Sequence, residues 1–226
     1  METCSGTSLP GSRKGCPYNN ISNQNTNHQL NKHIQKLFKT KMVLASSSPR
    51  RIDLMDKLGF DFKVHIADIE EMKDDFASPI KLVKINALKK SRSIALHYKK
   101  EVIISADTIV ALGNRILHKP ESLAEAKKHL KKLSGNKHSV YTGFNIINTA
   151  NGKEIYDYEK TVVEFRKLGD DEIDYYVKNH KVLDKSGSYG IQDEFGSLFV
   201  KKITGDFYNV VGLPITKLYL NLLRIL

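Results

Sequence analysis

The chain has 226 residues, of which 40% are hydrophobic and 27% are charged, a balance typical of a globular protein with a hydrophobic core. No apolar run approaches the roughly 20 residues of a membrane-spanning helix, and the two cysteines, Cys4 and Cys16, offer neither a disulfide framework nor a cysteine-rich metal site. The formal net charge of +11 favours an anionic partner such as a nucleotide, although a lysine-rich surface in solvent is the simpler explanation.

Residues 1–38 differ in composition from the rest of the chain. They are rich in Asn, Ser and Gln and mostly lack apolar periodicity, so we expect a disordered extension. This segment lacks the apolar middle section of a secretory signal. An acid-poor, Ser-rich start also suits an organelle transit peptide, but the abundant Asn favours simple compositional bias. We expect residues 39–226 to form one domain, and its lack of cysteine suits a reducing compartment.

Strand and helix patterns alternate along this domain, which indicates the α/β class. Apolar runs or period-two alternation predict strands. Ser-Pro or Ser-x-x-Glu starts followed by one apolar face predict helices, and Asn-Gly or Gly-Asn pairs predict hairpin turns. The predicted elements are, in chain order, strand 42–46, helix 48–58, strand 60–66, helix 78–98, strand 101–106, hairpin 108–117, helix 122–134, strands 138–149 and 153–165, helix 170–178, a Gly-rich loop at 184–196, strand 197–203 and helix 213–226.

The segment LASSSPRRIDLM, residues 44–55, gathers side chains that suit an anion. Backbone N–H groups at a helix start attract negative charge, and Ser46, Arg50 and Arg51 lie at this predicted start. Arginine in a first turn opposes the helix dipole, so the pair suggests a negative ligand, and guanidinium groups recognise phosphate. The alternative stays open on this local pattern: Ser48 caps the helix and the arginines are exposed.

Other candidate side chains follow predicted strands or lie in loops. Asp107 directly follows an apolar strand, where a carboxylate could bind a metal, activate water or only cap the next turn. Glu70 and Glu71 add carboxylates, and magnesium prefers one or two of these plus substrate phosphates. Lys119 could reach a phosphate, and the Gln192 amide could pair with a base edge. Each could equally be a surface residue, but together they suit a metal-assisted nucleoside triphosphate hydrolase.

Five motif segments resemble the Maf family of nucleoside triphosphate pyrophosphatases over about residues 42–226. The segments are LASSSPRR, SADTIV with HKPES, LSGNKHSVYTG, DKSGSYGIQ and GDFYNVVGLP. The resemblance implies an α/β fold with a mixed twisted sheet, flanking helices and two lobes around a cleft, similar to the inosine triphosphate pyrophosphatases. It also implies a cytoplasmic enzyme, often a homodimer, that cleaves a nucleoside triphosphate to the monophosphate and pyrophosphate with a divalent metal, Mg or Mn. We expect no membrane or nucleic-acid partner.

The resemblance also implies roles for particular residues. Asp107 would be the proton acceptor and, with Glu71, would hold the metal. The phosphates would be held by Ser46, Arg50, Arg51, Lys89 and Lys119. Lys90 departs from the family pattern, which usually has alanine after the residue matching Lys89, and puts an extra charge near the expected site.

Three positions match the subgroup that acts on dTTP and UTP: Arg50, Thr108 and Gln192. An amide such as that of Gln192 can pair with the O4 and N3–H edge of thymine or uracil, so we expect pyrimidine nucleotides, modified ones included, as substrates. The alternatives are a pyrophosphatase for another modified nucleotide such as 7-methyl-GTP, or a non-catalytic nucleotide-binding regulator of cell division.

Overall fold

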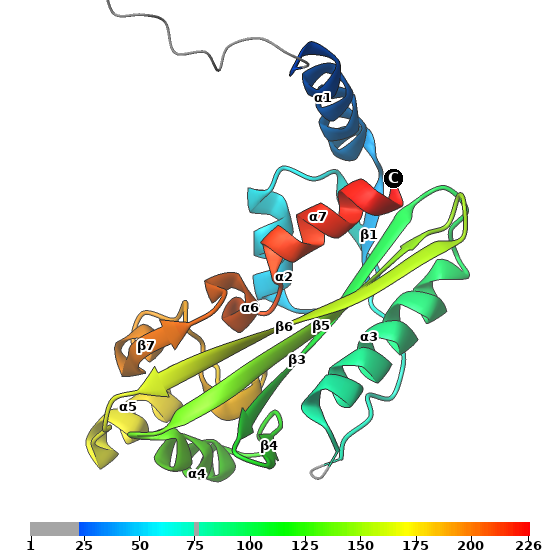
Figure 1. Cartoon of the computed structure of the whole chain (residues 1–226). Helices are drawn as coiled ribbons and strands as arrows, with labels where there is room; N and C mark the ends of the chain where they lie inside the picture. The colour runs from blue at the N-terminus through cyan, green and yellow to red at the C-terminus, as the bar shows by residue number, and fades with distance from the viewer. Residues whose placement is uncertain (1–22, 75–76) are drawn as a thin grey trace, which may run out of the picture.

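The computed structural model describes residues 23–74 and 77–226, and its frame is one mixed seven-stranded sheet (Figure 1). The strands are β1 (Met42–Leu44), β2 (Phe62–Val64), β3 (Val102–Leu112), β4 (Arg115–Leu117), β5 (Lys137–Asn148), β6 (Lys153–Phe165) and β7 (Val200–Thr204). Their order is β2-β1-β3-β5-β6-β7, with β4 paired to β3. Strand β1 runs parallel to β2 and β3, whereas β3, β5, β6 and β7 pair antiparallel. The predicted α/β class with a mixed sheet is confirmed.

Helices cover both faces of the sheet. They are α1 (Asn23–Lys39), α2 (Pro49–Lys57), α3 (Pro79–Ala95), α4 (Leu123–Leu133), α5 (Asp170–Asn179), α6 (Phe207–Val211) and α7 (Ile215–Ile225), with short 3-10 turns η1 (Ser186–Ser188) and η2 (Gly196–Phe199). Helix α3 packs along β3 and β5 on one side, and α2, α6 and α7 lie on the other (Figure 1). All three residues of β1 are therefore buried, Val43 toward α3 and Leu44 in the larger core on the opposite face. None of the helices in these ranges is long and apolar enough to cross a membrane.

Strand β3 is longer than predicted, and this changes the setting of Asp107. The β-branched and apolar residues 108–111 continue the antiparallel ladder with β5, in which Asp107 pairs with Gly143. Asp107 therefore lies within the strand, and the prediction that it directly follows the strand end is wrong. Because successive residues of a strand point to opposite faces, Asp107 points toward α3 and Thr108 points away from it.

The N-terminal segment also differs from the prediction. Residues 1–22 lie outside the described residues, but Asn23–Lys39 form helix α1 instead of a disordered segment. Its last turn is held by the domain: Leu37 is fully buried in the core, and Phe38 packs on Phe60 with ring centroids 5.7 Å apart. Lys36 also donates to the carbonyl of Leu226. Tertiary contacts of this kind stabilise a helix that composition alone does not indicate.

Candidate active site

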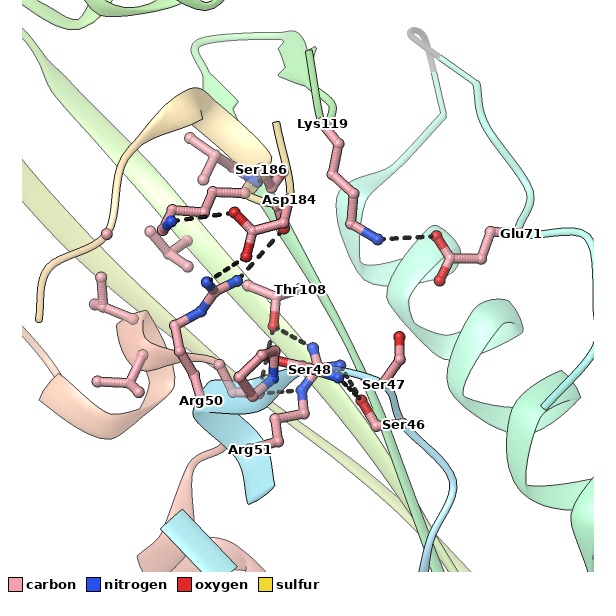
Figure 2. A pocket seen from close by; sticks show the side chains of 18 of the residues that line it. Ser46, Ser47, Ser48, Arg50, Arg51, Glu71, Thr108, Lys119, Asp184 and Ser186 are labelled. Carbon is pink, nitrogen blue, oxygen red and sulfur yellow. Dashed lines mark hydrogen bonds and ion pairs between the residues drawn. The ribbon is translucent and has the colours of Figure 1, made fainter. Parts of the chain in front are cut away.

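A cavity of about 220 Å³ opens where three segments far apart in the sequence meet (Figure 2). These segments are the β1–α2 turn, the loop around η1 and the end of α6 at Gly212. A smaller cavity of about 40 Å³ adjoins it and is lined by Asp107. The two cavities share the lining residues Glu71, Thr108, Lys119 and Ser186. Of the predicted site residues, the structure brings together Ser46, Arg50, Arg51, Glu71, Asp107, Thr108 and Lys119.

Helix α2 begins after the β1–α2 turn as predicted, and the serines of this turn also line the cavity. Ser48 occupies the N-cap position and Pro49 the first helical position, yet the Ser48 side chain makes no capping hydrogen bond. Ser46 Oγ accepts from the Ser48 backbone N–H at 3.2 Å, which tightens the turn. Ser46, Ser47 and Ser48 line the cavity at the start of the helix, where backbone N–H groups favour an anion.

Arg51 is buried, and each of its three guanidinium nitrogens donates to a different segment. Nε donates to the Gly212 carbonyl at 2.8 Å, Nη1 to Ser46 Oγ at 3.0 Å and Nη2 to Thr108 Oγ1 at 2.9 Å. Gly212 adopts φ +126°, a conformation that glycine tolerates and that L side chains rarely adopt. Burial lowers the pKa of Arg51, and the carboxylates of Asp107 and Glu71 oppose this effect. Arg51 thus organises the cavity by joining α2, β3 and α6.

Arg50 has a different partner and a more open position. Its Nη1 forms an ion pair with Asp184 Oδ2 at 2.9 Å, across the mouth of the cavity from the serines (Figure 2). Burial alone would raise the pKa of Asp184, but hydrogen bonds from Lys185 and Arg50 outweigh it and lower that pKa. An ion pair with this exposure contributes little to stability, so Arg50 can exchange its carboxylate for a phosphate oxygen at low cost.

Two carboxylates converge on one buried ammonium group. Lys90 Nζ lies 2.6 Å from Glu71 Oε1 and 2.9 Å from Asp107 Oδ1. Asn86, one helical turn before Lys90, donates to Asp107 Oδ2 at 3.0 Å and also binds the backbone of Met72 beside Glu71. Burial opposes ionisation of Glu71, but Lys90, Lys119 and Arg51 outweigh it and lower its pKa. Both carboxylates are therefore held close to one cation at a single point of the site.

Lys89 does not line either cavity, and the side chain that reaches the carboxylates is Lys90. Adjacent helix residues differ by about 100° in direction, so Lys90 shares the inward face of α3 with Asn86 while Lys89 is exposed. Lys119, by contrast, extends to 3.7 Å from Glu71 Oε2 from the loop after β4 (Figure 2). The phosphate-binding role expected for Lys89 therefore stays a prediction, made for a side chain that lies outside both cavities.

Gln192 is exposed and lines neither cavity, although its neighbour Ile191 lines the larger one. Thr108 lines both cavities and exchanges a hydrogen bond of 2.9 Å with Thr142 on β5. The wall of the larger cavity near the loop around η1 is apolar. It is formed by Val110, Val140, Tyr189, Ile191, Val210 and Val211. The cavity therefore has a polar end suited to phosphates and an apolar side suited to a flat ring.

Sequence reasoning missed several residues of the site. The sequence pattern indicates Lys90 only as an extra charge, and it assigns no role to Asn86, Asp184 or Lys185. The four-residue spacing of Asn86 and Lys90 on one predicted helix was the available signal for that pair. Asp184 begins the motif segment DKSGSYGIQ, but no local pattern indicates its contact with Arg50, which spans 134 positions.

Tyr189 of the apolar wall is fixed by a buried histidine. His138 on β5 is 2% exposed, and its Nε2 lies 2.8 Å from the Tyr189 hydroxyl. Both rings pack edge-to-face on Phe165. Burial lowers the pKa of His138 to about 4, so the ring is neutral at pH 7.

The low pKa of His138 predicts a loss of stability in mild acid. The unfolded chain takes up this proton near pH 6.5 and the folded chain near pH 4. The unfolded state therefore binds more protons between these values, and the free energy of unfolding falls as the pH drops through them, by about 1–2 kcal/mol from pH 7 to pH 5. Urea unfolding at both pH values should show a smaller difference for His138→Gln than for the wild type. Equal differences would contradict this assignment.

Comparison with known proteins agrees with the family resemblance of the five motif segments. A family model described as "Maf-like protein" matches residues 41–225. Curated relatives from Bacillus anthracis, Bacillus cereus and Bacillus mycoides are each 46% identical over 178 residues, or 79% of this chain and 92% of the relative, and each is named dTTP/UTP pyrophosphatase. The solved Staphylococcus aureus Ham1 protein is 17% identical, with a TM-score of 0.42 over 56% of this chain and 72% of that one. The family model spans nearly the whole of the domain. This match and the curated relatives show that the chain belongs to the Maf family.

Proposed function

We propose that the protein hydrolyses nucleoside triphosphates, with dTTP and UTP foremost and modified pyrimidine nucleotides included, to the monophosphate and pyrophosphate. The observation that carries the proposal is the convergence of Glu71 and Asp107 on one point beside the arginine-rich start of α2. Relatives that are 46% identical to this chain over 178 residues are named dTTP/UTP pyrophosphatase. We also expect a homodimer and a cytoplasmic location, as in the family.

The polar end of the cavity would receive the triphosphate. The serines of the β1–α2 turn, with Arg50 and Lys119, present donors and positive charge there. The apolar wall would then hold the base, close to Ile191. Gln192, the next residue, would read the O4 and N3–H edge of thymine or uracil by turning its exposed amide inward.

Glu71 and Asp107 fit the requirements of a divalent cation, Mg or Mn. They already share a single positive group, Lys90 Nζ, and magnesium prefers one or two carboxylates completed by phosphate oxygens and water. Among residues 23–74 and 77–226 no group of three or more His, Cys, Asp or Glu side chains gathers around one point, so the substrate phosphates would complete the ligand set. The bound metal would neutralise negative charge on the phosphates.

Side chains of the protein would activate the water, position Asp107 and stabilise the leaving group. Asp107 orients the attacking water and accepts its proton as the bond between the α- and β-phosphates breaks. Lys90 and Asn86 hold both oxygens of Asp107 in place. Lys119, Arg50 and the start of α2 stabilise the charge that builds on the leaving pyrophosphate.

A nucleotide panel tests the proposal. The purified chain is incubated with each common nucleoside triphosphate and with 7-methyl-GTP, in the presence of Mg²⁺ or Mn²⁺, and pyrophosphate and orthophosphate are measured separately. We expect pyrophosphate release that is fastest with dTTP and UTP. Orthophosphate release would identify a phosphatase, preference for 7-methyl-GTP would favour the other subgroup, and binding without release would indicate a non-catalytic protein.

A further inference from the structure

A buried lysine lies in the wall of the larger cavity and has no part in the mechanism above. Lys185 is 6% exposed, and its Nζ lies 3.1 Å from Asp184 Oδ1 and 3.5 Å from Asp193 Oδ2. It also donates to the backbone carbonyl of Lys181. Burying an ammonium group is costly unless it is paired, so two carboxylates and one carbonyl fix Lys185 in a single position.

One of these carboxylates leads to the phosphate end of the cavity. Asp184 binds Lys185 through Oδ1 and Arg50 through Oδ2, the latter at 2.9 Å. The Asp184 carboxylate can hold Arg50 at the mouth of the cavity only while its own position is defined (Figure 2). Lys185 fixes the position of this carboxylate from the buried side.

The other carboxylate leads to the base end. Asp193 Oδ2 accepts from the Tyr176 hydroxyl at 2.6 Å, and the same hydroxyl oxygen accepts from the Gly190 backbone N–H at 3.0 Å. The packing here leaves no room for a side chain at position 190, because a Cβ atom would lie 2.5 Å from the Asp193 carboxylate. Gly190 and Ile191 line the cavity, and Gln192 follows them.

These contacts form one continuous chain of side chains, Arg50–Asp184–Lys185–Asp193–Tyr176, that ends on the backbone of Gly190. We propose that Lys185 is a positioning residue for base selectivity: it locks the turn at 190–192 in register with Arg50, so that only a base of the right edge pattern fits when the triphosphate is bound. This inference rests on the proposed function. Lys185 lines the cavity, but its ammonium group is held by protein groups, so it acts through its two carboxylate partners.

The test is a change in selectivity with the chemistry retained. We expect Lys185→Met to lower the ratio of kcat/KM for dTTP to that for dCTP about tenfold. The two nucleotides share their sugar and triphosphate and differ on the base edge, so a general loss of structure would lower both values equally. The KM for dTTP should rise more than kcat falls. Lys181→Met, which removes the same charge from an exposed position four residues away, should leave the ratio unchanged.

A second variant decides the matter if Lys185→Met does not fold. Tyr176→Phe keeps the buried ring and removes only the hydroxyl that joins Asp193 to Gly190, and it should lower the same ratio. Unchanged selectivity in the folded variants, or equal losses for both nucleotides, would overturn the inference alone. A wild-type chain that releases no pyrophosphate from any nucleotide would overturn the proposed function as well.

Discussion

Replacing Asp107 by asparagine should lower kcat for pyrophosphate release from dTTP about 10²–10⁴-fold, the range expected when a general base is lost. Asparagine has the shape of aspartate, and its carbonyl oxygen can still accept from Lys90 or Asn86. It cannot accept a proton from water. The binding of dTTP should therefore persist, which equilibrium binding to the variant can measure beside kcat.

Asp53→Asn provides a matched control for this variant. Asp53 is a carboxylate on helix α2 that pairs with Lys57 in solvent, outside the cavity, so its replacement should leave kcat unchanged. If Asp107→Asn keeps near-full activity, the proton acceptor is another group. If it loses dTTP binding and kcat together, the carboxylate serves mainly to bind substrate or metal.

The order of strands and helices was predictable because periodicity and caps are local. Ser48-Pro49, Ser78-Pro79 and Ser122 begin helices at the expected residues, and Ser122 Oγ accepts from the Glu125 N–H at 3.2 Å. The hairpin turns also lie where Gly113 and Gly152 indicate. The extent of β3 was not predictable in this way, since its extra length depends on pairing of residues 108–111 with residues 139–142 of β5, which are distant in the sequence.

The site was predictable in kind but not in geometry. The motif segments contain most residues that line the two cavities, but they do not show which side-chain atoms already form hydrogen bonds within the protein. Arg51 was expected to bind phosphate, whereas all three of its nitrogens donate to the protein. Arg50, on the same turn, is the arginine with an exchangeable partner. The difference depends on the packing of α6 and β3 around the turn, which no local pattern contains.

The choice between Lys89 and Lys90 leads to the second large effect. Replacing Lys90 by methionine leaves Asp107 and Glu71 facing each other without the cation between them, and the side chains of Lys90 and Asp107 are each only 10% exposed. Breaking a buried ion pair costs about 3–5 kcal/mol. Because Glu71 is 35% exposed, we expect a smaller loss, about 2–4 kcal/mol in the free energy of unfolding measured with urea.

The activity of Lys90→Met should fall as well, because Asp107 would lose the group that fixes Oδ1 and the repulsion from Glu71 would favour its protonated form, which cannot accept a proton. Lys89→Met is the matched control: it removes the same charge from the next residue of the same helix, on the exposed face, and should change stability by less than about 0.5 kcal/mol and leave kcat unchanged. If Lys89→Met abolished activity while Lys90→Met did not, helix α3 would present the opposite face to the substrate. The ammonium group between the two carboxylates would then contribute to folding alone.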